Sequence, residues 1–131
     1  MEPEPRLAAR SYRDLQVWQL GMDLAELCYR LTKSFPREEA FGMTGQIRRA
    51  SSAIPANIAE GYGREGSVEF IHFLRIAQGS LKELETHLLL SVRVELLNEQ
   101  ETQPAFDYCD RTGRMLKALI NSLREKTKRT L

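Results

Sequence analysis

Residues 46–64 read QIRRASSAIPANIAEGYGR and combine a helical pattern with an internal proline and a glycine-rich end. Apolar side chains such as Ile47 and Ile54 recur at spacings of three and four, which predicts one buried face of a helix. Pro55 removes a backbone N–H donor from the middle of this helix, yet the apolar period continues past it. We therefore predict one continuous, kinked helix that ends at Gly61, in the left-handed conformation that glycine adopts readily.

The same spacing extends outward on both sides of this stretch. Three further helices are expected. The first begins at the capping pair Ser11 and Asp14 and ends at Phe35. The second begins with Ser67 as its N-cap and ends at residues 94–97, and the third begins at Thr102. Asn98 and Glu101 form a possible capping box before the last helix. Without any strand pattern, these segments predict an all-α fold, an antiparallel up-and-down four-helix bundle that oligomerises. We expect a disordered N-terminal lead at 1–10, the bundle at 11–127 and a frayed basic tail at 128–131.

The composition suits one ordinary folded domain, because 42% of the 131 residues are hydrophobic and 28% are charged. The start, MEPEPRLAAR, has no apolar segment of the kind that secretory signals contain, and no apolar run approaches the length of a membrane span. We therefore expect a cytoplasmic protein with no membrane partner. Cys28 and Cys109 lie far apart among apolar residues, which predicts two reduced core thiols.

The first helix carries two neighbouring apolar stripes instead of one. The first stripe comprises Leu15, Trp18, Met22, Ala25, Tyr29 and Thr32. The second stripe, which is the candidate subunit interface, comprises Val17, Leu20, Leu24, Leu27 and Leu31. Either the helix is buried on two sides within one protomer, or one face packs on the core and the other on another subunit. We favour the second interpretation, because a bundle of this size leaves each helix an outer face.

Catalytic patterns are missing from this sequence. Glu69 and His72 have the Glu-x-x-His spacing of di-iron bundles, but such a site needs a second copy of the motif, and the chain has none. No phosphate-binding loop, nucleophile elbow or zinc pattern is present either. We predict no catalytic residue, no metal, no cofactor and no enzymatic activity. Structural roles in the central helix are assigned to Pro55, Asn57, Glu60 and Gly61.

Basic side chains remain as candidates for contact with a ligand. The net charge is only +1, so nucleic-acid binding requires charge that is concentrated locally or summed over an oligomer. Arg48 and Arg49 are separated by about 100° around the helix, so we expect one to point outward and the other to reach toward Glu60 or a neighbouring subunit. The candidate nucleic-acid-binding residues are Arg48, Arg49, Arg64, Arg75, Lys82, Lys126, Lys128 and Arg129.

Several runs of residues together indicate a family. They are DLQVWQ at 14–19, YRLT at 29–32 with Phe35-Pro36, QIRRA at 46–50, IPANIAEG at 54–61 and FLRIAQGSLKELE at 73–85. These runs resemble the four-helix-bundle proteins encoded in intervening sequences of bacterial 23S ribosomal RNA genes, and the similarity covers nearly the whole chain after residue 10. The accessory variability determinant of diversity-generating retroelements belongs to the same broad group. The resemblance implies a homopentamer and a basic surface that binds nucleic acid, with no enzymatic activity. In the retroelement branch it also implies a reverse-transcriptase partner.

Two functions therefore stay open at the level of sequence. The first is binding of structured RNA, or of a nucleic-acid-processing partner, through Arg48, Arg49, Arg64 and the basic tail. The second is a structural or protein-interaction scaffold that presents an apolar or acidic surface and binds no nucleic acid.

Overall fold

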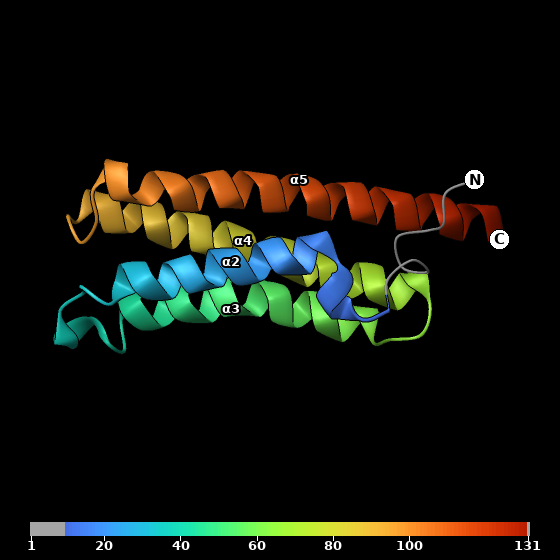
Figure 1. Cartoon of the computed structure of the whole chain (residues 1–131), viewed down its shortest axis with the longest axis horizontal. Coiled ribbons are helices and arrows are strands. Elements are labelled where there is room, and N and C mark those ends of the chain that lie inside the picture. Colours follow the sequence, from blue (N-terminus) through green and yellow to red (C-terminus); the bar gives the residue numbers. More distant parts are fainter. Residues whose placement is uncertain (1–9, 131) are drawn as a thin grey trace.

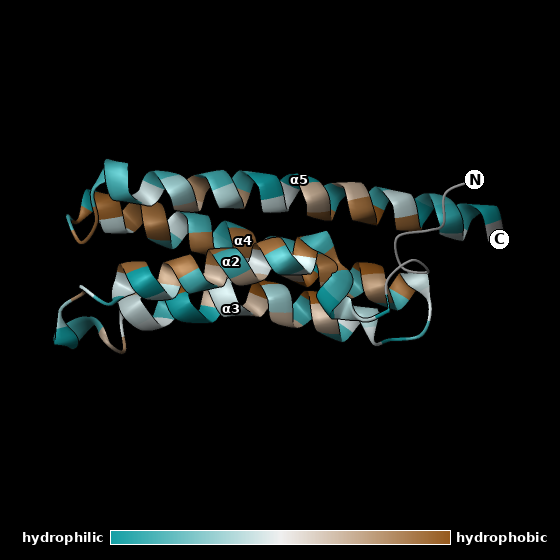
Figure 2. Cartoon of the chain, viewed as in Figure 1, coloured by the Kyte–Doolittle hydropathy of each residue, from teal (hydrophilic) through white to brown (hydrophobic). Residues whose placement is uncertain are grey.

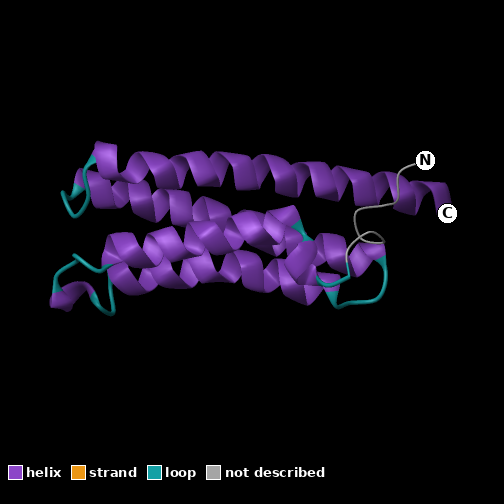
Figure 3. Cartoon of the chain, in the orientation of Figure 1, coloured by secondary structure: helices purple, strands orange, loops and turns teal. Residues whose placement is uncertain are grey.

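The computed structural model describes residues 10–130, so nearly all of the predicted N-terminal lead lies outside the described residues. These residues form four long helices and two short 3₁₀ helices, with no strand among them: η1 (Tyr12–Asp14), α2 (Gln16–Thr32), η2 (Arg37–Glu39), α3 (Met43–Tyr62), α4 (Ser67–Arg93) and α5 (Glu99–Thr130). The all-α prediction is confirmed (Figure 3).

The four long helices lie side by side along the long axis of the molecule (Figure 1). The α2–α3 and α4–α5 connections lie at one end, and the α3–α4 connection lies at the other. Contacts join α2 to α3, α3 to α4, α4 to α5 and α2 to α5, so each helix has two main neighbours around a shared core. In Figure 2 every long helix carries both hydrophilic and hydrophobic residues, as amphipathic helices around a common core do.

Capping residues set two of the helix starts. Ser11 and Asp14 form the predicted capping box, although it caps η1, and α2 begins at Gln16 only after an extended residue. Before α5, Asn98 Oδ1 accepts the Glu101 N–H at 2.7 Å, and a Glu101 carboxylate oxygen accepts the Asn98 N–H at 2.8 Å. The second box therefore starts α5 at Glu99, three residues before the predicted start.

Helix α3 passes through Pro55 without a break, as the continuing apolar period predicts. The prediction that Gly61 ends the helix is wrong, because the helix continues to Tyr62 and its C-cap is Gly63, at a φ of −75°. Gly61 is buried instead, and a Cβ added there would lie 2.7 Å from Phe73 Cβ. This glycine therefore permits the close approach of α3 and α4.

The predicted N-cap of α4 is also wrong. Gly66 is the N-cap, and Ser67 is the first residue of the helix. Gly66 has a φ of +87°, in the region that side chains disfavour, so the turn between α3 and α4 depends on glycine here. At the other end of the chain, α5 remains helical through Thr130, so residues 128–130 of the predicted tail continue the helix.

The core contains the second apolar stripe of α2. Val17, Leu20 and Leu24 are buried within the chain, and Leu27 and Leu31 are half-buried against the same core. The large hydrophobic residues of α2 that are left exposed belong to the first stripe, where Met22 is 45% and Tyr29 is 41% exposed. The predicted interface stripe thus packs against its own chain, and a subunit interface on α2 stays a prediction.

No helix within residues 10–130 is long and apolar enough to cross a membrane.

Candidate nucleic-acid interface

The neighbouring arginines of α3 play different roles, as their angular separation predicts. Arg48 turns toward α2, where its Nε donates to Thr32 Oγ1 at 2.9 Å and its guanidinium lies 4.7 Å from the centre of the Tyr29 ring. A further, longer contact joins Arg48 Nη2 to the Tyr29 carbonyl at 3.4 Å. Arg48 therefore ties the start of α3 to the end of α2, and its partner is not Glu60. Arg49 is exposed.

Arg64 lies beyond the opposite end of α3. Its guanidinium is 3.6 Å from a Glu60 carboxylate oxygen and 5.1 Å from the centre of the Phe73 ring. Asn57 also bonds locally, donating from Nδ2 to the Ala53 carbonyl at 2.8 Å. Sixteen residues separate Arg48 from Arg64, about 24 Å at the rise of an α-helix. The arginines of residues 46–64 are therefore spread along α3 and do not form one site.

Two other predicted residues, Arg75 and Lys82, do lie together. They extend from α4 along a groove between α4 and α5, and Arg114 and Lys117 extend from α5 along the same groove. We call this the basic groove. Its volume is about 680 Å³.

Small and apolar residues line the bottom of the basic groove. Gly79 of α4 and Gly113 of α5 contribute no side chain, and Leu81 and Cys109 are almost fully buried there. A Cβ added at Gly113 would lie 3.3 Å from Leu81 Cδ2, whereas a Cβ at Gly79 would meet nothing within 4 Å. The groove is therefore open above Gly79, with its basic side chains on either side.

The charge of the basic groove is positive. Two acids also line it, and each forms an ion pair there: Lys82 Nζ lies 3.1 Å from Glu85, and Arg114 lies 2.9 Å from Asp110. No acid within residues 10–130 pairs with the exposed Arg75 or Lys117. Two uncompensated positive charges thus remain, one on each helix.

The basic residues near the end of α5 lie beyond the basic groove. Lys126 is nine residues after Lys117, about 14 Å farther along the helix. Lys128 approaches Glu125 at 3.9 Å, and Arg129 Nε donates to the Glu125 carbonyl at 3.4 Å. These residues form a separate basic segment.

Sequence reasoning did not single out Arg114 and Lys117. A signal for them exists in the spacing around the two glycines. Arg75 and Lys82 lie four residues before and three after Gly79, while Arg114 and Lys117 lie one and four after Gly113. Aligning the two glycines across a helix pair would have brought all four bases together.

The other reactive groups among residues 10–130 offer no second site. No cluster of three or more His, Cys, Asp or Glu residues suited to a metal occurs within the described part of the chain. Burial raises the pKa of Cys28 and of Cys109 to about 12, so both thiols stay protonated near neutral pH. His72 of the Glu-x-x-His motif packs edge-on against Phe73, with ring centres 5.3 Å apart.

These observations define a class of protein: a four-helix chain with a basic groove between two of its helices. Comparison with protein families matches residues 13–118 to the 23S rRNA-intervening sequence proteins. The chain belongs to this family, which confirms the resemblance read from its motifs.

A solved structure supports the same fold. It is a protein of unknown function from the S23 ribosomal protein family, from Bacteroides thetaiotaomicron. Its structure superposes on this chain with a TM-score of 0.71, and the two sequences are 24% identical. The match covers 79% of this chain and 97% of the other. No curated protein matches the chain.

Proposed function

We propose that the chain is a non-enzymatic, cytoplasmic protein that folds as an antiparallel up-and-down bundle, assembles as a homo-oligomer and binds structured RNA through its basic groove. The observation that carries this proposal is the convergence of Arg75 and Lys82 on α4 with Arg114 and Lys117 on α5. The alternation of the connections between the two ends of the molecule supports the up-and-down arrangement (Figure 1).

A polyanion suits the chemistry of the basic groove. Guanidinium and ammonium groups bind phosphate oxygens, and their contacts with a nucleic-acid backbone release condensed counterions. The groove adds two uncompensated charges per protomer, and an oligomer repeats them once per subunit. The name of the family, 23S rRNA-intervening sequence protein, is consistent with RNA as that polyanion.

The test compares two variants with equal changes in charge. The first, Arg75→Gln with Lys117→Gln, removes the uncompensated charges of the basic groove. The control, Arg30→Gln with Lys33→Gln, removes one arginine and one lysine from exposed positions at the end of α2. Binding of a fluorescein-labelled RNA hairpin is followed by fluorescence anisotropy at low salt.

We expect the groove variant to bind roughly 10-fold or more weakly than the wild type, because it loses two phosphate contacts. The control variant should bind within about threefold of the wild type, since distant exposed charges are screened. Equal losses in both variants would show that net charge, and not the groove, determines binding.

The competing candidate is a protein-interaction scaffold without nucleic-acid binding. Large apolar residues exposed near the α4–α5 connection, including Leu89, Leu90 and Val94, favour it. If the wild type binds no RNA hairpin even at low salt, the scaffold becomes the better account.

A further inference from the structure

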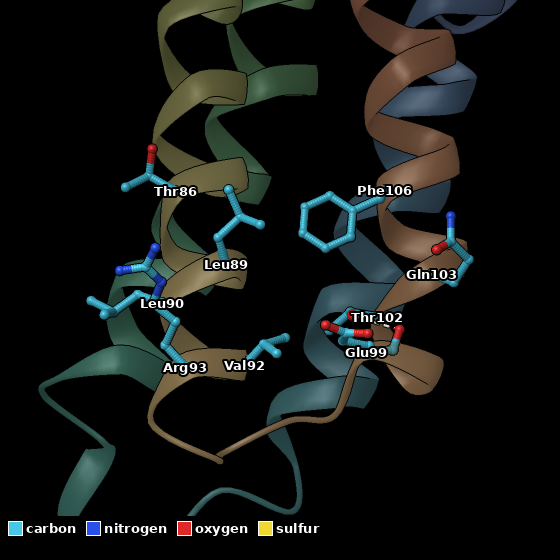
Figure 4. Close-up of a pocket in the computed structure, with 9 residues that line it drawn as sticks. All are labelled: Thr86, Leu89, Leu90, Val92, Arg93, Glu99, Thr102, Gln103 and Phe106. Carbon is cyan, nitrogen blue, oxygen red and sulfur yellow. Dashed lines mark hydrogen bonds between the residues drawn. The ribbon is translucent and has the colours of Figure 1, made fainter.

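A second groove lies between α4 and α5, nearer their connection, and its lining is apolar. Leu89, Leu90 and Val92 line it from the α4 side, and Phe106 lines it from α5. In Figure 4 the side chains of Leu89 and Phe106 point toward each other from opposite walls, with open space between them. We call this the apolar groove, and its volume is about 630 Å³.

No residue between 10 and 130 fills the apolar groove. Leu89 is 57% exposed and Leu90 is exposed as well, although both are leucines on a helix that buries many others. Contiguous exposed apolar residues around a hollow are typical of a site that binds another apolar group. The groove therefore needs an occupant that supplies a large apolar side chain.

Phe41 is such a side chain. It lies in the connection between η2 and α3 and is 97% exposed, the most exposed of the large hydrophobic residues in the described part of the chain. Its ring takes no part in the core of its own protomer. A benzyl group is small enough for a hollow of about 630 Å³, and aromatic residues, Phe among them, are enriched at the core of protein interfaces.

The positions of Phe41 and the apolar groove suit one another. The η2 connection and the α4–α5 connection lie at the same end of the molecule, while α3 and α5 lie along its two opposite edges in Figure 1. One protomer can therefore present its η2 connection to the α4–α5 edge of the next at the same height along the bundle. A contact of this kind joins two different surfaces of the chain.

The charges near Phe41 and around the apolar groove are complementary. Exposed Arg37 and Glu38 precede Phe41 in η2, and neither pairs with an opposite charge within residues 10–130. On the groove, Arg93 lies on the α4 wall and Glu99 on the α5 wall (Figure 4). Glu39, the other acid of η2, is half-buried and accepts the Met43 N–H at 3.0 Å. Each side of the contact thus offers one exposed acid and one exposed base to the other.

We propose that Phe41 of one protomer inserts into the apolar groove of a second copy of this chain. Because the two surfaces differ, the contact is head-to-tail and repeats from copy to copy, and it forms a ring when the rotation between neighbours closes. The inference rests on the oligomer of the proposed function and identifies the residues that hold it. Phe106 lines both grooves, so the subunit contact lies beside the basic groove.

The test uses three single variants, each at an exposed position. Phe41→Glu removes the inserted ring, Leu89→Glu places a charge in the apolar groove, and Val68→Glu is the control at the other end of the molecule, where Val68 is 68% exposed. Circular dichroism checks that each variant is folded, and Leu89→Gln replaces Leu89→Glu if the latter is not. Size-exclusion chromatography with light scattering gives the masses at equal concentration.

We expect the wild type and the Val68 variant to have the same mass, above that of two protomers of 15.0 kDa. Phe41→Glu and Leu89→Glu should each be monomeric, because losing an aromatic anchor weakens association by roughly 30-fold or more. Mixed together, these two variants should form a heterodimer, since the intact Phe41 of one meets the intact groove of the other. The heterodimer should grow no further.

Three outcomes would overturn this inference alone. The first is an oligomeric Phe41→Glu or folded groove variant, and the second is a mixture of the two variants that stays monomeric. The third is a dimeric wild type, which would refute the ring. A monomeric wild type would refute both this inference and the oligomer of the proposed function, while RNA binding by the basic groove would still be decided separately by the Arg75 and Lys117 variant.

Discussion

Gly61 tests the account of how α3 and α4 pack. An alanine Cβ at this position would lie 2.7 Å from Phe73 Cβ, 3.0 Å from Phe70 Cδ1 and 3.2 Å from the Phe70 carbonyl. Phe73 Cβ is bonded directly to the α4 backbone, and the Phe70 carbonyl oxygen is part of that backbone. A change of side-chain rotamer therefore cannot move either atom away. Gly61→Ala therefore forces the two helices apart.

The magnitude follows from two opposing effects. Inserting a methyl group into a packed interface typically costs about 1–3 kcal/mol. Alanine in place of glycine within a helix stabilises that helix by about 1 kcal/mol. Because a 2.7 Å contact with Phe73 Cβ is severe, we place the cost at the upper end and expect a net loss of about 2 kcal/mol. For a chain of this size, that loss lowers the Tm by roughly 8 °C.

Gly79→Ala is the matched control, because it makes the same chemical change on α4 where a Cβ meets nothing within 4 Å. We expect this variant to gain about 0.5–1 kcal/mol from reduced backbone entropy. Urea unfolding followed by circular dichroism measures both variants against the wild type. If Gly61→Ala is as stable as the wild type or more so, the proposed close approach of α3 and α4 is refuted.

Three further changes test the remaining structural assignments. Arg48→Gln should lower the free energy of unfolding by about 1–2 kcal/mol, because it removes a charged hydrogen bond and a ring contact to α2; Arg49→Gln should change it by less than about 0.5 kcal/mol in the same urea titration. Asn98→Ala should cost about 1 kcal/mol through loss of the α5 capping box, measured by thermal unfolding. Burial raises the pKa of Cys28 and Cys109 from 9.0 to about 12, so the folded state holds these protons more tightly. Stability should therefore fall as the pH rises from 9 toward 12, by up to about 1.4 kcal/mol per thiol and pH unit, and a double Cys→Ala variant should lose that dependence in urea titrations at successive pH values.

Local patterns were enough to predict much of the fold. The apolar spacing of Ile47 and Ile54 continues past Pro55, and this predicted an unbroken α3 correctly. The Asn98–Glu101 pair was also recognisable, because a capping box is local in sequence. Gly61 was misinterpreted, since a glycine that ends a helix and one that admits a neighbouring helix look alike without the position of α4.

The candidate site depended on information that the sequence pattern lacks. Arg75 was predicted from charge alone, but its proximity to Lys117 follows from the register of α4 against α5. Arg48 was predicted as a ligand contact, whereas packing brings it to Thr32 and Tyr29 of α2. Which bases share a groove, and which are used within the fold, is set by tertiary contacts.

The salt dependence of RNA binding tests the central claim most directly. The two uncompensated charges of the basic groove predict that affinity of the wild type falls roughly 10-fold between about 50 and 200 mM salt. Arg75→Gln with Lys117→Gln should reduce the slope of log affinity against log salt concentration by about 2, while Arg30→Gln with Lys33→Gln leaves it unchanged. A slope that is the same in the wild type and the groove variant would contradict the account.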